Sequence, residues 1–141
     1  MIKAIIFDLD NTLLDFVKMK RFAVRAAVTA MNEAGLGVDE KKAFDDIFDL
    51  YLNKGWEHQQ VFDDYLQQTT GKVSNKVLAA GIVSYRRARE ATLLVYPNVN
   101  KTLIELLKMG IKLAVVSDAP SREAWMRLYY LNLHQIGRAH V

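Results

Sequence analysis

Two short apolar segments, each ending abruptly in polar residues, constrain the fold of this chain most strongly. The first is IKAIIF at 2–7, followed by Asp-Leu-Asp-Asn-Thr, and the second is IKLAVV at 111–116, followed by Ser-Asp-Ala-Pro. Near-continuous apolar runs of this length are typical of strands that are buried on both faces of a parallel sheet. In open α/β sheets, ligands bind at the carboxyl ends of such strands. The sequence therefore predicts a parallel sheet with a polar site where the two strands end.

The stretch between the two segments, from about residue 17 to 92, has the periodicity of amphipathic helices. Stop signals and N-caps divide this stretch into four helices. The stops are Gly35, Gly37, Gly55 and Gly71, and the N-caps are Asp39 and Ser74. The first helix is expected to carry Phe22 on its apolar face. The sequence therefore predicts a small helical bundle inserted between the two strands.

The second strand is preceded by one helix and followed by another. A helix over 98–109 ends at Gly110, and Ser121 is expected to cap a last helix over 121–134. A helix followed by a strand is half of a βαβ crossover, which implies a parallel sheet. The predicted class is therefore α/β. These predictions divide the chain into a core, residues 1–15 and 94–135, and a helical insert, residues 16–93.

The composition of the chain limits the classes of partner that we expect it to bind. The formal net charge is +3, from 19 basic and 16 acidic residues that are largely scattered, and the sequence has no basic stripe with interleaved aromatic residues. The absence of cysteine excludes disulfides and thiolate metal sites. No apolar run approaches the ~20 residues of a membrane span, and the N-terminus lacks a signal-peptide pattern. We therefore expect a cytoplasmic protein with neither a nucleic-acid nor a membrane partner.

Polar side chains follow both predicted strands. They are Asp8, Asp10, Asn11 and Thr12 after the first strand, and Ser117 and Asp118 after the second. Two carboxylates at this spacing fit three roles: they hold a cation such as Mg²⁺, they act as nucleophile and general acid/base, or they only cap turns. The position of Asp8 and Asp10, directly after a buried strand, favours a chemical role over turn capping.

Three features together resemble the haloacid-dehalogenase (HAD) superfamily of hydrolases. FDLDNTL at 7–13 resembles the first motif of that superfamily, and VVSDAP at 115–120 resembles the second. The helical insert at 16–93 resembles the C1-type cap of subfamily I, which includes phosphoglycolate phosphatases and haloacid dehalogenases. The resemblance extends to about residue 135, and it implies a Rossmann-like core with an inserted four-helix cap.

The resemblance also implies roles for individual residues. Asp8 is the implied nucleophile that forms an aspartyl-phosphate, and Asp10 is the implied acid that protonates the leaving alkoxide and later deprotonates water. Mg²⁺ is then held by the Asp8 carboxylate and the Asp10 backbone carbonyl. The Ser117 hydroxyl donates to a phosphate oxygen. The remaining expected phosphate contacts come from Leu9, Asn11, Thr12 and Asp118.

The implied function is Mg²⁺-dependent phosphatase activity on a small phosphorylated metabolite. Hydrolytic dehalogenases resemble this motif without the second aspartate, so Asp10 favours phosphate chemistry, whereas phosphomutases of the superfamily keep both aspartates. A non-catalytic fragment that keeps a phosphate or Mg²⁺ pocket is a further alternative. A helical interaction module is disfavoured, because such a module has no use for two buried strands that end in polar loops.

Two parts of the implied site are not found in the sequence: a lysine beside the nucleophile and an acidic pair for the metal. Asp45–Asp46 and Asp63–Asp64 are acidic pairs, but both lie on the amphipathic helices, and we interpret them as solvated. We also expect residues 136–141 to be a non-native tail, since QIGRAHV at 135–141 corresponds to a translated sequencing adapter. The expected protein is therefore C-terminally truncated, with two sheet strands and little activity.

Overall fold

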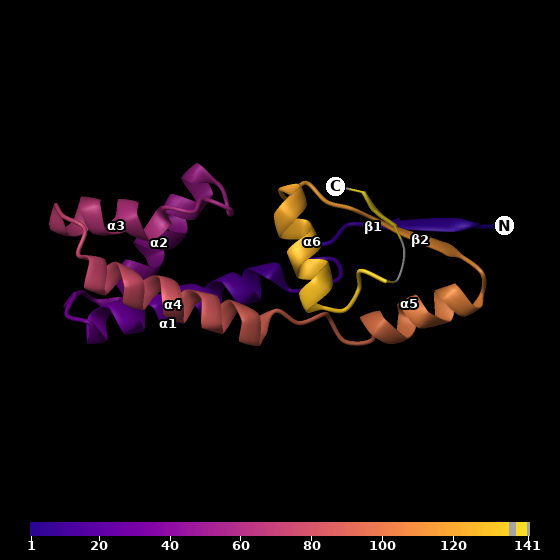
Figure 1. The fold of residues 1–141 in the computed structure, drawn as a ribbon, viewed down its shortest axis with the longest axis horizontal. Helices are drawn as coiled ribbons and strands as arrows, with labels where there is room; N and C mark the ends of the chain where they lie inside the picture. Colours follow the sequence, from indigo (N-terminus) through magenta and orange to yellow (C-terminus); the bar gives the residue numbers. More distant parts are fainter. Residues whose placement is uncertain (136–137, 141) are drawn as a thin grey trace. The chain divides into compact units, whose positions relative to one another are not determined.

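The computed structural model describes residues 1–135 and 138–140, which form a three-stranded sheet and six helices. The α/β class with a parallel sheet is confirmed. In chain order the elements are β1 (Ala4–Phe7), α1 (Phe16–Glu33), α2 (Glu40–Lys54), α3 (Val61–Thr70), α4 (Asn75–Thr92), α5 (Val99–Lys108), β2 (Lys112–Val116), α6 (Ser121–Tyr130) and β3 (Arg138–His140) (Figure 1).

The chain divides into two compact units. One consists of Met1–Lys18 together with Leu93–Val141 and contains the sheet, and we call it the sheet unit. The other consists of Met19–Thr92 and contains helices alone among its regular elements, and we call it the helical unit. Among the described residues, no helix is long and apolar enough to cross a membrane.

The sheet has the strand order β1-β2-β3, and both neighbouring pairs are parallel. Ile5 lies opposite Leu113, and Phe7 lies opposite Val115, so that β1 and β2 end side by side (Figure 1). Helix α5 packs against β2 and leads into it through Gly110, whose φ of 74° is left-handed. This left-handed residue ends the helix where the sequence places its stop signal.

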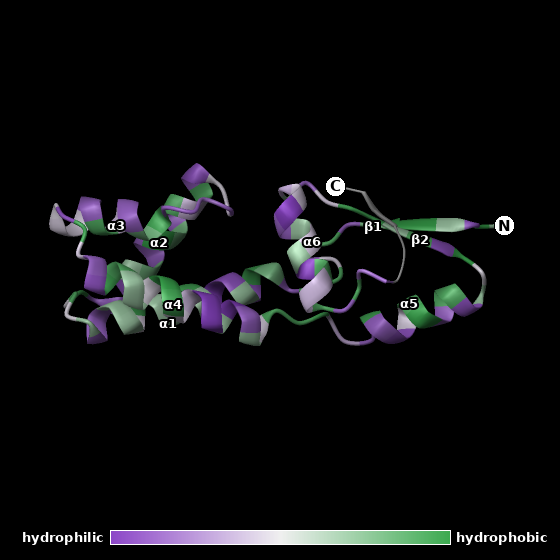
Figure 2. Cartoon of the chain, viewed as in Figure 1, coloured by the Kyte–Doolittle hydropathy of each residue, from purple (hydrophilic) through white to green (hydrophobic). Residues whose placement is uncertain are grey.

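The prediction that both strands are buried on both faces is wrong. Ile6 in β1 is 67% exposed and Val116 in β2 is 51% exposed, whereas Ile5 and Phe7 are partly buried. The physical reason is that β1 is an edge strand and its exposure alternates along the chain, as in a sheet covered on one face. In Figure 2 most of the β1 ribbon has the green of hydrophobic residues.

A third strand extends the sheet beyond the two that the sequence predicts. Arg138–His140 pairs with β2 in parallel, with Ala139 opposite Val115. The predicted non-native tail at 136–141 includes this strand, while its residues 136, 137 and 141 lie outside the described residues. That the tail is non-native stays a prediction.

The helical unit encloses its own hydrophobic core. Its fully buried members on the first helix are Ala23, Val24, Ala27, Val28 and Met31, and the second to fourth helices contribute Ala43, Ile47, Leu50, Tyr51, Val61, Phe62, Tyr65, Leu66, Val77 and Tyr85. The prediction that Phe22 faces this core is wrong, since its side chain is 45% exposed. The buried stripe of α1 follows Ala23, Ala27 and Met31, one position away from the predicted stripe, and this leaves Phe22 outside the core.

The ends of the helices agree only in part with the ends predicted from the sequence. Asp39 caps α2 as predicted, because its Oδ1 accepts a hydrogen bond from the Lys42 backbone N–H at 2.7 Å. The prediction that Ser121 caps α6 is wrong: Ser121 is the first helical residue, and Pro120 occupies the cap position without a side-chain hydrogen bond. The helix also ends at Tyr130 rather than at residue 134, and Asn132 follows with a left-handed φ of 55°.

The first prediction concerns Gly81 on α4, which is buried against α1. A Cβ at Gly81 would lie 2.9 Å from Cγ and Sδ of the buried Met31. We expect Gly81→Val to destabilise the helical unit by about 1–3 kcal/mol through overpacking. Urea unfolding followed by circular dichroism measures this, with the same side chain at the exposed Ala79 of the same helix as the control. Equal stability of the Gly81→Val and Ala79→Val variants would contradict the close approach.

The second prediction concerns acid sensitivity. Lys54 Nζ and His58 Nε2 lie 2.7 and 2.6 Å from Asp64 Oδ2, and these hydrogen bonds lower the pKa of the Asp64 carboxyl below its ordinary value. A lowered folded-state pKa stabilises the fold above the unfolded value of about 3.9, and this contribution is lost as pH falls through the folded pKa.

We therefore expect Asp64→Asn to lower the unfolding midpoint at pH 6 and to have no effect at a pH below both pKa values. Urea unfolding at the two pH values measures the difference. Asp63→Asn, at the preceding position of α3, is the control. A midpoint difference for Asp64→Asn that is as large in acid as at pH 6 would contradict the assignment.

Candidate active site

The turn after β1 positions the two predicted catalytic aspartates. Leu9, Leu13 and Leu14 are buried and anchor the turn on either side of Asp10. Its backbone closes through hydrogen bonds from Leu13 N–H to Leu9 O at 3.0 Å and from Asn11 N–H to Leu14 O at 2.8 Å. A buried apolar frame therefore holds a short polar segment at the carboxyl end of the strand.

Asn11 has the backbone conformation that this turn needs. Its φ of 58° is left-handed, a region that asparagine tolerates better than most residues. The Asn11 side chain also accepts a hydrogen bond from Val17 N–H at 3.2 Å, so that it links the turn to the first residues of α1. Asn11 thus has a structural role in addition to the phosphate contact that the sequence predicts.

Asp8 is the exposed carboxylate of the site. It directly follows β1, and its Oδ1 accepts a hydrogen bond from the Leu9 backbone N–H at 2.8 Å. The exposed side chain leaves Asp8 accessible to a reactant. This exposure suits a nucleophile.

The second strand ends beside the first. Because Phe7 lies opposite Val115, Asp8 and Ser117 follow the paired ends of β1 and β2 almost in register. Ser117 is buried, and its Oγ accepts a hydrogen bond from Ala119 N–H at 3.2 Å, which leaves the hydroxyl proton available for donation. Asp118, by contrast, is exposed.

Asp10 forms an ion pair that sequence reasoning missed. Arg127 of α6 donates from Nη1 to Asp10 Oδ2 at 3.1 Å, and the side chains are 8% and 20% exposed, respectively. The Arg127 guanidinium also lies 4.7 Å from the centroid of the Phe16 ring. Asp10 is therefore held by a buried cation from an element 117 residues away in the chain.

The sequence contains a pattern that could have indicated the buried position of Arg127. Arg127 falls between Ala124 and Leu128 on the buried face of α6, where a charged residue is unexpected. An arginine on an apolar helix face predicts a buried acidic partner. The sequence alone does not identify that partner, because the pairing depends on where α6 packs.

Three other residues predicted to contact phosphate use their backbone N–H groups for hydrogen bonds within the turn. Leu9 N–H donates to Asp8, Asn11 N–H donates to Leu14 O, and Thr12 N–H donates to Leu9 O at 3.3 Å. The Thr12 side chain is exposed. Phosphate binding by these residues stays a prediction.

The turn contains oxygen donors of the kind that Mg²⁺ prefers. Mg²⁺ prefers oxygen ligands, keeps several waters and takes one or two carboxylates from a protein. Asp8 and the neighbouring Asp10 carbonyl fit that pattern as hard oxygen donors. Within the described residues, no group of three or more histidine, cysteine, aspartate or glutamate side chains is placed to hold a metal. By the chemistry of its donors the turn offers two protein oxygen ligands for Mg²⁺, and metal binding there stays a prediction.

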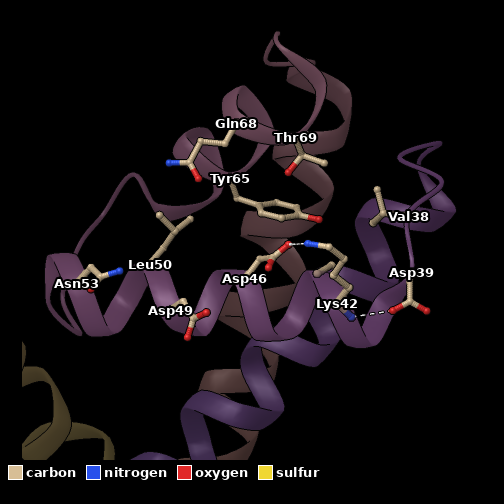
Figure 3. Close-up of a pocket in the computed structure, with 11 residues that line it drawn as sticks. Val38, Asp39, Lys42, Asp46, Asp49, Leu50, Asn53, Tyr65, Gln68 and Thr69 are labelled. Atoms are coloured by element: carbon tan, nitrogen blue, oxygen red, sulfur yellow. Dashed lines mark hydrogen bonds and ion pairs between the residues drawn. The ribbon is translucent and has the colours of Figure 1, made fainter.

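The acidic pairs of the helical unit lie on helix surfaces. Asp46 of α2 pairs with Lys42 at 2.6 Å beside a groove of about 480 Å³, and Figure 3 shows this pair below Tyr65. Asp64 of α3 pairs with Lys54 and His58. These ion pairs explain the positions of Asp46 and Asp64, so that no catalytic role is needed to explain them.

The third prediction tests the Arg127–Asp10 pair by a double-mutant cycle. We expect Arg127→Met to destabilise the chain by about 3 kcal/mol, because it leaves a largely buried carboxylate beside an apolar side chain. Asp10→Asn should then cost less in the Arg127→Met background than alone, with a coupling energy of about 1–3 kcal/mol. Denaturant unfolding of the four proteins measures this coupling, and strictly additive changes would contradict the pair.

The comparison with known proteins covers nearly the whole chain. Residues 2–140 match haloacid dehalogenase-like hydrolases. A relative from Methanocaldococcus jannaschii, named glyceraldehyde 3-phosphate phosphatase, is 37% identical over 95% of this chain and 59% of its own length. One of the same name from Methanopyrus kandleri is 35% identical over 95% of this chain and 58% of its own length.

A solved structure from Thermotoga maritima, assigned as a beta-phosphoglucomutase, shares the fold. It matches with a TM-score of 0.71 and 22% identity over 98% of this chain and 61% of that one. The chain thus spans about three-fifths of the length of these relatives. On the match of residues 2–140, the chain belongs to the haloacid dehalogenase-like hydrolase family.

Proposed function

We propose that the chain carries the nucleophile and the acid–base residue of a Mg²⁺-dependent phosphatase for small phosphate monoesters. The observation that carries the proposal is the arrangement of Asp8 and Asp10 in a buried-leucine turn, beside the strand that Ser117 follows. Membership of the family and the two relatives named glyceraldehyde 3-phosphate phosphatase support it. That ester is therefore the first candidate substrate.

In the proposed reaction, a carboxylate oxygen of Asp8 attacks phosphorus, and the bond from phosphorus to the substrate oxygen breaks. Asp10 gives its proton to the departing alkoxide. Water then attacks phosphorus of the aspartyl-phosphate, Asp10 takes a proton from that water, and inorganic phosphate leaves with the Asp8 carboxylate restored. The Ser117 hydroxyl donates a hydrogen bond to a phosphate oxygen in both steps.

The Asp8 carboxylate and the Asp10 carbonyl would hold Mg²⁺, which offsets the repulsion between an anionic nucleophile and an anionic phosphate. In our proposal the Asp10 side chain exchanges a proton while Arg127 anchors it. The backbone carbonyl and the side chain of Asp10 thus have separate tasks.

We further propose that the helical segment, residues 16–93, acts as the cap of the enzyme. A cap of this kind excludes water during the first step and completes the substrate site. The inserted segment has its own core, so it can keep its structure while the rest of the enzyme binds substrate.

The fourth prediction tests the nucleophile. We expect Mg²⁺-dependent but slow release of phosphate by the 141-residue chain, because the implied lysine and acidic pair are not identified in it. Asp8→Asn should lower this release by at least about 100-fold, since the amide is a poor nucleophile. A phosphate-release assay with glyceraldehyde 3-phosphate and other small monoesters measures it.

Asp15→Asn is the matched control, because Asp15 is a nearby carboxylate whose Oδ1 accepts a hydrogen bond from Lys18 N–H at 3.1 Å. The Asp15→Asn variant should keep its activity. Release that is unchanged in Asp8→Asn, or that does not depend on Mg²⁺, would contradict the proposal. Fast turnover that requires Asp8 would contradict only the expectation of weak activity.

A further inference from the structure

The helical unit contains a buried lysine that the proposed reaction does not use. Lys20 of α1 is only 4% exposed. Its ammonium donates a hydrogen bond to the hydroxyl of Tyr85 on α4 at 2.6 Å, and it lies 4.1 Å from the centroid of the Tyr51 ring on α2. Lysine is rarely buried to this extent. Three helices therefore combine to fix one cation inside the unit.

A small cavity lies against this lysine. It has a volume of about 70 Å³ and lies wholly within the helical unit. Its lining residues are Lys20, Tyr51, Glu57, His58, Gln59, Val61, Phe62, Ile82, Tyr85, Arg86 and Arg89. Because one water needs roughly 10–15 Å³ of such space, the cavity has room for several waters or for one small polar group.

The lining has an excess of positive charge. Lys20, Arg86 and Arg89 are cations, and Glu57 is the one carboxylate among the lining residues. Burial first, and then the neighbouring Tyr85, raise the pKa of the Tyr51 hydroxyl well above its ordinary value. Tyr51 therefore remains a neutral hydroxyl at physiological pH and does not compensate the cations.

We propose that this cavity binds the carboxylate group of a small organic acid. The ammonium of Lys20 supplies hydrogen-bond donors at the wall of the cavity, and Arg86 and Arg89 supply further positive charge. Attraction between opposite charges is stronger in a partly desolvated site than in water. The volume suits a two- or three-carbon acid rather than a larger ligand.

The inference goes beyond the phosphatase proposal, because none of these residues belongs to the Asp8–Asp10 turn. The carboxylate has two possible sources: an acid that also carries a phosphate group, or an acid that does not. Both present the same chemical group to Lys20. A phosphate-free acid such as glycolate is therefore the appropriate first probe.

The fifth prediction is that glycolate shifts amide resonances of residues lining the cavity in a ¹⁵N-labelled sample of the whole chain. We expect Lys20→Met, which keeps the length of the buried side chain, to weaken glycolate binding by at least about tenfold. Glycolate binding should persist in Asp8→Asn, which separates this result from the fate of the phosphatase proposal. No saturable shift at these residues, or equal affinity in Lys20→Met, would overturn the inference.

Two adjacent arginines on α4 give a test variant and a matched control, and neither substitution changes the buried core. Arg86 lines the cavity, whereas its exposed neighbour Arg87 does not. Arg86→Gln should weaken glycolate binding by roughly two- to fivefold, and Arg87→Gln should leave it unchanged. Equal effects of the two variants would show that net charge alone attracts glycolate, and would overturn the proposed site.

Competition identifies the source of the carboxylate. 2-Phosphoglycolate that displaces glycolate from the Asp8→Asn variant more strongly than acids without a phosphate group would assign the cavity to a phosphorylated acid. Equal displacement by acids with and without a phosphate group would assign it to an unphosphorylated acid. Either result supports a carboxylate site.

Discussion

Two neighbouring strands can run parallel only if a long connection returns the chain to the same edge of the sheet. Here β1 and β2 pair in parallel, with Ile5 opposite Leu113, and the connection between them contains the helical unit and α5. The parallel register places Asp8 and Ser117 at adjacent strand ends. The proposed chemistry depends on this pairing, because antiparallel strands would put the two polar ends at opposite edges.

Three further features of the structure hold the site in place beside this strand pair. Buried leucines fix the backbone of the turn, and the left-handed Asn11 lets it close. Arg127 then orients Asp10 from α6, while Asp8 remains exposed. The two carboxylates are two positions apart in sequence and yet have different surroundings. Such a difference in environment is what separates a nucleophile from an acid–base group in related chemistry.

Much of this architecture could be predicted from local sequence patterns. The strand-end polar residues, the parallel α/β class and the four inserted helices follow from apolar periodicity and from caps such as Asp39. The exposure of Ile6 and the Arg127–Asp10 pair could not be predicted, because both depend on which elements pack together. The same holds for Lys20, whose surroundings come from three helices that are far apart in sequence.

The central claim is that Asp8 is a carboxylate poised to accept a phosphoryl group. Beryllofluoride forms a complex with such carboxylates that mimics aspartyl-phosphate, so ¹⁹F NMR of the chain with beryllofluoride and Mg²⁺ tests the claim without requiring turnover. Our account predicts bound fluoride resonances that require Mg²⁺, disappear in Asp8→Asn and persist in Asp15→Asn. Bound resonances that survive in Asp8→Asn, or none at saturating beryllofluoride and Mg²⁺ in the unaltered chain, would contradict it.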